Sequence, residues 1–254
     1  MHAFSPAGYA LLILGSVAAG FINVFAGGGG IIVLLVMMLA GLSPMSANMS
    51  STIAVMPGLV SSLWFIRRDL EPGRHRLPLL LWIGLLGGLA GALLLLLTPS
   101  QWFSAAVPYL VLMATLSFVY GTWFFKKSEA VAGHHHRLDW SQVLGLVVLS
   151  IYGGYYGGGV SIMTLALMAF GPWGGIRGMN ALKLYFGIMT NVAGIFLFAF
   201  YGDISWTAVW VVALGATLGG YAGSRFIRQV NTTVLNVLVV LFSLSMTVYL
   251  FVTR

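Results

Sequence analysis

Apolar residues run along almost the whole chain in stretches of about 20, which is the length that a helix needs to cross a bilayer core of about 30 Å. The polar connections between them are short, and the longest, Lys126 to Asp139, divides the chain nearly in half. The sequence lacks the segments of about 10 alternating residues that are typical of transmembrane barrels. The pattern therefore predicts an all-α integral membrane protein.

Two of the expected helical segments are too short to span. In chain order, the segments are Gly8 to Ala26, Ile31 to Gly41, Met49 to Ile66, Leu77 to Leu97, Trp102 to Phe125, Trp140 to Tyr156, Val160 to Phe170, Met179 to Tyr201, Ser205 to Ser224 and Val234 to Val252. Eleven helical residues rise about 16 Å, roughly half of the hydrocarbon core. The second and seventh segments have that length, and each is expected to close with a glycine and a proline, at Gly41 and Pro44 or at Gly171 and Pro172. We expect both to be re-entrant.

A run of glycines precedes each short segment. The first run is Gly27, Gly28, Gly29 and Gly30, and the second is Gly157, Gly158 and Gly159. Glycine destabilises a helix by roughly 1 kcal/mol per residue relative to alanine, so both runs predict breaks. The alternative is close helix packing, which we favour for the separate motifs at Gly87 to Gly91 and Gly219 to Gly223. Consecutive glycines do not follow packing spacing, so we favour a ligand site at the two runs.

The order of elements repeats in the second half. A constant offset of 132 aligns Asn48 with Asn180, Glu71 with Asp203, and Gly87 with Gly219. Internal repeats are typical of transporters. We interpret residues 1–125 as a first repeat, 126–139 as a cytoplasmic linker, and 140–254 as a second repeat, each with about four helical segments.

Basic residues decide between parallel and inverted repeats. If the short segments are re-entrant, each half crosses three times, the repeats are inverted, and nearly all basic connections fall on one side. That segregation follows the positive-inside rule and predicts extracytoplasmic termini. If the short segments cross fully, the basic connections fall on both sides. We favour the inverted arrangement.

Composition supports a membrane protein and excludes several kinds of site. Hydrophobic residues make up 59% of the chain and charged residues 7%, far below the roughly 25% of soluble domains. The net charge of +7 is explained by orientation, not by nucleic acid. There is no cysteine, and His134 to His136 is expected to be a solvated loop, so no metal or cofactor is predicted. No cleavable signal is evident.

The breaks suggest an anion site. Each short helix begins with backbone N–H groups that lack an intrahelical acceptor, and its dipole favours an anion there. Lys183 either faces a cavity or snorkels to the interface. Neutral hydrogen-bonding residues follow the breaks and either bind an oxyanion or bridge helices: Asn48, Ser51, Thr52, Asn180 and Asn191. Tyr156 flanks the second break and either lines the cavity or packs.

These motifs resemble the TauE/SafE sulfite exporter family, also called TSUP. The resemblance rests on two glycine runs, the short segments that follow them, and the openings A-N-M-S-S-T (from Ala47) and M-N-A-L-K (from Met179). It implies a bacterial or archaeal inner-membrane carrier for sulfite, thiosulfate, taurine, sulfoacetate or related anions. It also implies pore or substrate roles for the two glycine runs, Asn48, Thr52, Asn180 and Lys183.

We therefore expect a secondary transporter that moves small sulfur oxyanions by alternating access, through export or facilitated flux. Its expected partners are a small anionic substrate and the lipid bilayer, and the chain acts as a monomer or a homodimer. The alternatives are an anion channel and a membrane-embedded enzyme or accessory protein that uses Lys183.

Overall fold

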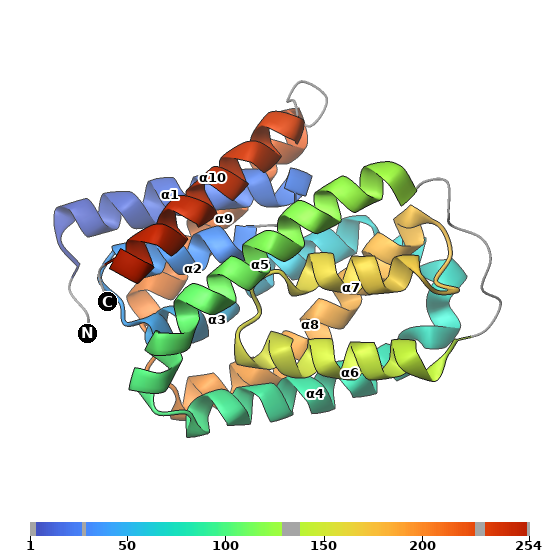
Figure 1. Cartoon of the computed structure of the whole chain (residues 1–254). Helices are drawn as coiled ribbons and strands as arrows, with labels where there is room; N and C mark the ends of the chain where they lie inside the picture. The colour runs from blue at the N-terminus through green and yellow to red at the C-terminus, as the bar shows by residue number, and fades with distance from the viewer. Residues whose placement is uncertain (1–3, 27–28, 129–137, 227–231, 253–254) are drawn as a thin grey trace.

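The computed structural model describes residues 4–26, 29–128, 138–226 and 232–252, and these residues are helical apart from short turns (Figure 1). The elements are α1 (Pro6–Ala26), α2 (Gly29–Leu39), α3 (Pro44–Phe65), the 3₁₀ helix η1 (Arg67–Arg76), α4 (Leu77–Leu97), α5 (Ser100–Ser128), α6 (Trp140–Tyr155), α7 (Val160–Ala169), α8 (Ile176–Tyr201), α9 (Trp206–Phe226) and α10 (Thr232–Val252). The all-α prediction is confirmed.

The role of Pro44, between α2 and α3, differs from its prediction. Gly41 does end α2, with a φ of 103° that favours glycine. Pro44 was expected to belong to that stop, but it opens α3, where Ser43 caps the helix by accepting a hydrogen bond from the Ser46 N–H at 3.2 Å. Proline suits the first helical position because the N–H that it lacks would have no partner there.

The polar connection between α3 and α4 is a 3₁₀ helix and not an open loop. Tertiary contacts hold it in place. Gly73 lies against Leu182 of α8, with no room for a β-carbon, and the Arg76 guanidinium donates to the carbonyl of Pro172. The sequence pattern did not indicate these contacts, because they join distant parts of the chain.

Four helical stretches among the described residues are long and apolar enough to cross a membrane. They are Pro6–Asn23, Arg67–Leu97, Ser100–Tyr120 and Ile176–Tyr201. Large apolar side chains point outward from the bundle, for example Leu97, which is 80% exposed, and Phe200, which is 79% exposed. Exposed apolar surface of this extent fits contact with lipid and not with water.

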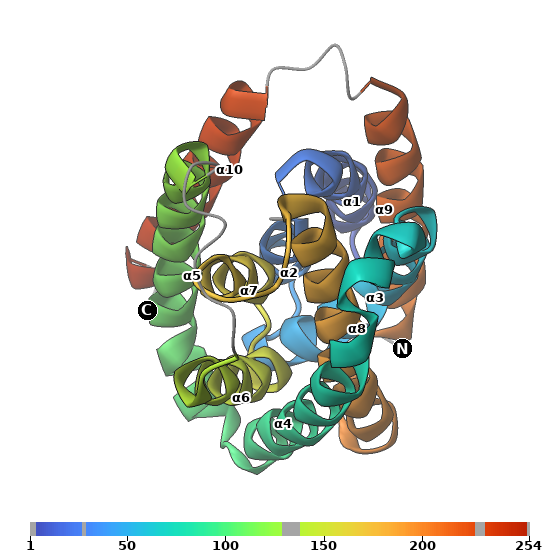
Figure 2. The same ribbon diagram turned by 90° about the vertical axis from the view of Figure 1, so that its right-hand side faces the viewer.

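The two short helices lie in the centre of the bundle, surrounded by the longer ones (Figure 2). In α2, every residue from Ile31 to Met37 is buried, so this helix has no lipid-facing side. Figure 1 shows that α2 turns back toward the side where α1 begins, whereas α7 turns back toward the opposite side, where α6 begins. The two hairpins therefore enter the bundle from opposite sides, as re-entrant segments of inverted repeats would. The inverted topology itself stays a prediction.

Candidate functional site

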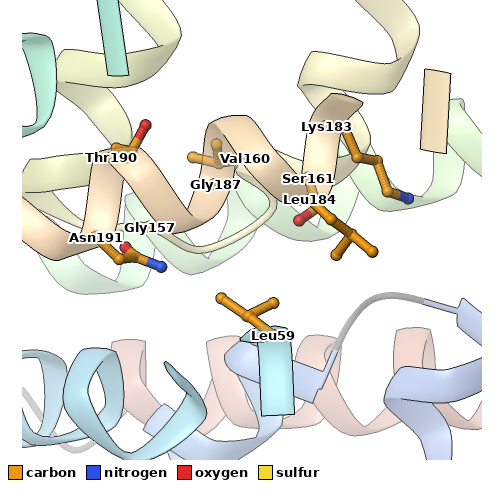
Figure 3. A pocket seen from close by; sticks show the side chains of 10 residues that line it. Leu59, Gly157, Val160, Ser161, Lys183, Leu184, Gly187, Thr190 and Asn191 are labelled. Carbon is orange, nitrogen blue, oxygen red and sulfur yellow. The ribbon is translucent and has the colours of Figure 1, made fainter. Parts of the chain in front are cut away.

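A small cavity lies beside the second glycine break, between α8 and α3 (Figure 3). It offers about 50 Å³ to the centres of water-sized molecules, whereas one water needs roughly 10–15 Å³ by the same measure. The residues that line it are Leu59, Gly153, Gly157, Val160, Ser161, Lys183, Leu184, Gly187, Thr190 and Asn191.

The backbone at this break takes a shape that glycine allows. Gly157 and Gly159 have φ values of 78° and 77°, in the left-handed region that side chains disfavour, and Gly159 is the N-cap of α7. The Tyr152 hydroxyl donates to the carbonyl of Gly158 at 2.8 Å and holds the turn. With these two left-handed glycines, the chain turns so that the first residues of α7, Val160 and Ser161, lie on the cavity wall.

Three backbone amides at the break remain without an acceptor. Within the described part of the chain, the N–H groups of Gly158, Gly159 and Ser161 form no hydrogen bond, whereas those of Ile162 and Met163 already donate to the Gly159 carbonyl. Because Ser161 also lines the cavity, its N–H is available to a ligand there. This is the backbone arrangement that favours an anion.

Lys183 supplies the positive charge of the cavity. It lies seven residues after the first residue of α8, about 10 Å along the helix axis, so it is deeper than the four residues suggested by the predicted helix start. Its ammonium group forms no hydrogen bond or ion pair with any described residue. Lys183 is partly exposed and lies on the cavity wall, which favours the cavity-facing interpretation over snorkelling, because a charge at this depth requires a polar cavity or a partner.

Two further polar side chains occupy the opposite end of the cavity, whereas Ser161 lies near Lys183. Figure 3 shows Thr190 and Asn191 at one end and Lys183 at the other. The Thr190 hydroxyl donates to the Phe186 carbonyl at 2.9 Å, which leaves its oxygen as an acceptor. The side chains of Asn191 and Ser161 form no hydrogen bond to the described residues. These two side chains therefore offer donors to an oxyanion.

The described part of the first glycine run does not contribute to this cavity. Gly27 and Gly28 lie outside the described residues. The Gly29 N–H donates to the Asn23 side-chain oxygen at 3.2 Å, and Gly30 has open space around the position of a β-carbon among the described residues. Neither Gly29 nor Gly30 lines the cavity, so within the described residues only the second run contributes to it.

The polar residues that follow the first break form contacts within the protein. The Asn48 side-chain amide donates to the Tyr155 carbonyl at 3.0 Å, at the end of α6. The hydroxyls of Ser51 and Thr52 both donate to the Asn48 carbonyl. These three residues and Asn180 do not line the cavity. A substrate role for them stays a prediction.

Tyr156 lies behind the break and not on the cavity wall. Its side chain is 4% exposed, and its hydroxyl has no hydrogen-bond partner within the described structure. Its ring stands against the Tyr152 ring, with centroids 6.0 Å apart. This placement favours packing, although the unpaired hydroxyl leaves a polar role open.

Sequence reasoning missed several of the residues that line the cavity. Ser161, Leu184, Gly187 and Thr190 line the cavity without having been predicted. A helical signal was present, because Gly187 and Asn191 lie four and eight residues after Lys183 and so share its face. No local signal marked Leu59, which comes from a different repeat.

Comparisons with known proteins agree on the class of this chain. The family model "Sulfite exporter TauE/SafE" matches residues 12–250. The probable membrane transporter protein of Haemophilus influenzae is 29% identical over 94% of this chain and 92% of its own length. The probable membrane transporter protein ORF9 of a Sinorhizobium species is 28% identical, over 95% and 91% of the two chains. The probable membrane transporter protein YfcA of Escherichia coli K12 is 25% identical, over 95% and 89%.

No solved structure matches the chain. The relatives are named as transporters and not as enzymes, and the helices suit a multi-pass membrane protein. The family model covers nearly the whole chain, with both glycine runs and the cavity. The chain is therefore a membrane transporter that belongs to the TauE/SafE sulfite exporter family.

Proposed function

We propose that this transporter is a secondary carrier for a small sulfur oxyanion, of the sulfite, thiosulfate, sulfonate, taurine or sulfoacetate type, in a bacterial or archaeal inner membrane. The observation that carries the proposal is the Lys183 ammonium, which has no partner among the described residues and lines a cavity beside the α7 N-terminus. An anion there satisfies both the charge and the free amide of Ser161.

The cavity divides the work of binding between its two ends. At one end, Lys183 contributes charge and Ser161 a directional donor, and at the other end Asn191 contributes a second donor to the oxygens of the anion. Leu59 and Leu184 exclude water from one wall, which strengthens each electrostatic contact. The cavity contains a single cation and no carboxylate among its lining residues, so its charge favours monovalent hydrogensulfite or a simple sulfonate over the divalent thiosulfate and sulfoacetate.

The carboxylates argue for a flux that needs no proton relay. Asp69 and Glu71 lie in η1, at the polar start of the Arg67–Leu97 stretch, Asp139 caps α6, and Asp203 follows α8, so no described carboxylate lies within the α-helical part of a candidate span. An inside-negative potential favours the exit of an anion by about 2.3 kcal/mol per charge per 100 mV. We therefore infer export or facilitated flux by alternating access. The anion channel shares these parts and differs in turnover.

A thermal-shift screen of the purified protein tests the site. Sulfite, sulfate, thiosulfate, taurine and sulfoacetate are added separately, and at least one of the sulfur oxyanions is expected to raise Tm. Saturation to about 100 times Kd corresponds to roughly 2.7 kcal/mol of stabilisation. If none of the five changes Tm, the anion site is rejected.

Flux in proteoliposomes tests the direction. Efflux of the stabilising anion is expected to follow an imposed voltage without a pH gradient, and to saturate with anion concentration as a carrier does. Uptake that strictly requires a proton gradient would rule out the proposed mode, and flux that does not saturate would favour the channel.

A further inference from the structure

The closest helix contacts in this protein join one repeat to the other. In α4, a β-carbon on Gly88 would stand 2.2 Å from the Thr190 carbonyl of α8, and one on Gly91 would stand 2.0 Å from the Ile151 carbonyl of α6. These helices belong to different repeats. Backbones that approach this closely leave no room for independent sliding.

The same arrangement occurs with the repeats exchanged. In α9, a β-carbon on Gly219 would stand 1.9 Å from the Val17 carbonyl of α1, and one on Gly20 of α1 would stand 2.1 Å from the Ala216 carbonyl. Hydrogen bonds also attach the start of α9 to α3, where the Ser205 N–H donates to the Ser50 hydroxyl at 3.1 Å. Thus α9, from the second repeat, is fastened to helices of the first.

These contacts define two composite bodies among the described helices. Body A contains α1, α2, α3 and α9, and body B contains α4, α6, α7 and α8; the most extensive pairings, α1 with α9 and α4 with α6 and α8, fall within a body. The two bodies meet where α3 packs against α8 and where the Asn48 side chain donates to the Tyr155 carbonyl. Figure 2 shows α4 and α6 at one end of the view and α1 and α9 at the other, with α3 and α8 side by side between them. The rigid units therefore differ from the sequence halves, residues 1–125 and 140–254.

The substrate cavity lies at the boundary between the two bodies. Nine of its ten lining residues come from α6, α7, α8 and the turn between α6 and α7, all in body B. Leu59 alone comes from body A, and Figure 3 shows it reaching across from α3. Opposite it on body B, Gly187 has open space around the position of a β-carbon. The site is thus complete on body B, apart from one wall.

We infer that transport separates body A from body B, and that Leu59 is the gate of the cavity and the residue that limits the size of its substrate. This inference rests on the proposed function, because it takes the cavity as the anion site. Movement of body A withdraws Leu59 and opens the site while the cation and the amide donors stay in place. Alternating access through rigid bodies around a fixed site has this form.

The gate is tested with sulfonates of increasing length. Thermal shifts are measured for methanesulfonate, ethanesulfonate, propanesulfonate and butanesulfonate with the wild type, Leu59→Ala and Leu59→Phe. Val60→Ala is the matched control, because its side chain is 49% exposed on the same helix. A hydrophobic wall discriminates against an added methylene by about 10-fold or more. Leu59→Ala is expected to shift the preferred chain length upward, and Leu59→Phe to shift it downward.

The outcomes of that experiment separate the two proposals. If no sulfonate or other anion stabilises the wild type, the proposed function fails. If the wild type responds and all variants keep its length preference, the cavity binds anions but the role of Leu59 is refuted.

The composite bodies are tested with spin labels, for which the absence of cysteine is an advantage. The last residues of α2, α4 and α8 are Leu39, Leu97 and Tyr201, and all three are exposed. Three double-cysteine variants are made, one for each pair of these positions. Distances are measured in nanodiscs with and without the anion that binds best. The pair 97 and 201 is expected to keep one narrow distance, although it joins the two repeats. The pairs 39 with 97 and 39 with 201 are expected to shift or broaden.

If the two sequence halves move as rigid units instead, two of the distances behave in the opposite way. The distance between positions 39 and 97 then stays fixed, and the distance between positions 97 and 201 varies. That result would overturn the inference. Three unchanging distances in protein that transports would also overturn it, because they would indicate a static pore.

Discussion

At the scale of single residues, two glycines of the second break are required by their backbone conformation. Gly159 has a φ of 77°, and a β-carbon there would lie 3.2 Å from the Ala114 Cα. A left-handed conformation costs a side chain roughly 1–2 kcal/mol. The sequence predicted a break at these glycines from helix propensity alone. The structure adds that the position of Gly159 disfavours any residue with a β-carbon.

Gly159→Ala is therefore expected to lower Tm, by the equivalent of about 1–2 kcal/mol. Gly30→Ala is the control, because Gly30 lies within α2 and has open space around it among the described residues. Alanine there is expected to leave Tm unchanged or raise it. Equal losses in both variants would contradict the conformational explanation.

Lys183 provides the second test at this scale. Lys183→Gln removes the charge and keeps most of the side-chain length, so it is expected to weaken binding of the stabilising anion about tenfold or more, since hydrogen bonds to charged groups contribute roughly 1.5–3 kcal/mol. Tm without anion is expected to stay the same or rise, because a cation without a partner costs stability. Isothermal titration measures the affinity, with Lys183→Arg as the charge-preserving control. Unchanged affinity in Lys183→Gln would place this cation outside the site.

At the scale of elements, Asn48 distinguishes helix bridging from substrate binding. Its side chain joins α3 to the last residue of α6 through a bond that spans 107 residues of sequence. Alignment with Asn180 had suggested a shared binding role. The side chain now has a structural partner, whereas Asn180 lies on a helix that reaches the cavity through other residues.

Asn48→Ala is expected to lower Tm in the absence of any anion, because the Tyr155 carbonyl loses its donor at a cost of about 1–3 kcal/mol. The anion-induced shift is expected to remain. Ser61→Ala on the same helix is the control, because its hydroxyl is exposed. A variant with normal Tm and no anion response would instead support the binding role.

The close glycine contacts of α4 and α9 provide a second prediction, which concerns how tightly these helices pack. Gly88→Ala and Gly219→Ala each place a β-carbon within 2.2 Å of a backbone oxygen, and overpacking of this kind costs about 1–3 kcal/mol or more. Both variants are expected to lose Tm, whereas Gly58→Ala, with no atom within 4 Å in the described structure, is expected to lose none. Tolerance of both substitutions would mean that these helices pack less closely.

At the scale of the whole molecule, the segregation of charge predicts orientation. Both chain ends lie on the opposite side of the bundle from η1 in Figure 1, and η1 carries four arginines. The positive-inside rule then places η1 in the cytoplasm and the termini outside. Inverted repeats require this relation, because each half crosses an odd number of times.

Single cysteines in the cysteine-free chain test the orientation. Ser5→Cys is expected to react with an impermeant maleimide on intact cells, and His75→Cys only after permeabilisation. Both residues are exposed, Ser5 directly precedes α1, and His75 lies in η1, on the opposite side of the bundle from the start of α1. The reverse pattern would contradict the predicted topology. Labelling of both residues from the same side would contradict the odd number of crossings.

The sequence by itself determined the elements of this protein, because they follow from local physics. Apolar runs predicted the spans, the Leu77 to Leu97 segment matches α4 residue for residue, and the second glycine run predicted a helix break. In the first run, Gly29 and Gly30 were wrongly predicted to lie in a break and instead begin α2, while Gly27 and Gly28 lie outside the described residues. These properties depend on propensity and on transfer to lipid, which act within one segment. The same reasoning identified Lys183 and Asn191 as candidates, and both line the cavity.

Only the tertiary structure decided which segments meet. Leu59 reaches a cavity built from the other repeat, Asn48 is engaged by Tyr155, and α4 packs against α6 and α8. Apolar helices are equally compatible with many neighbours, and pairing is selected by the fit of small residues against facing backbones. That fit is a property of two surfaces together, so neither segment of the sequence contains it alone.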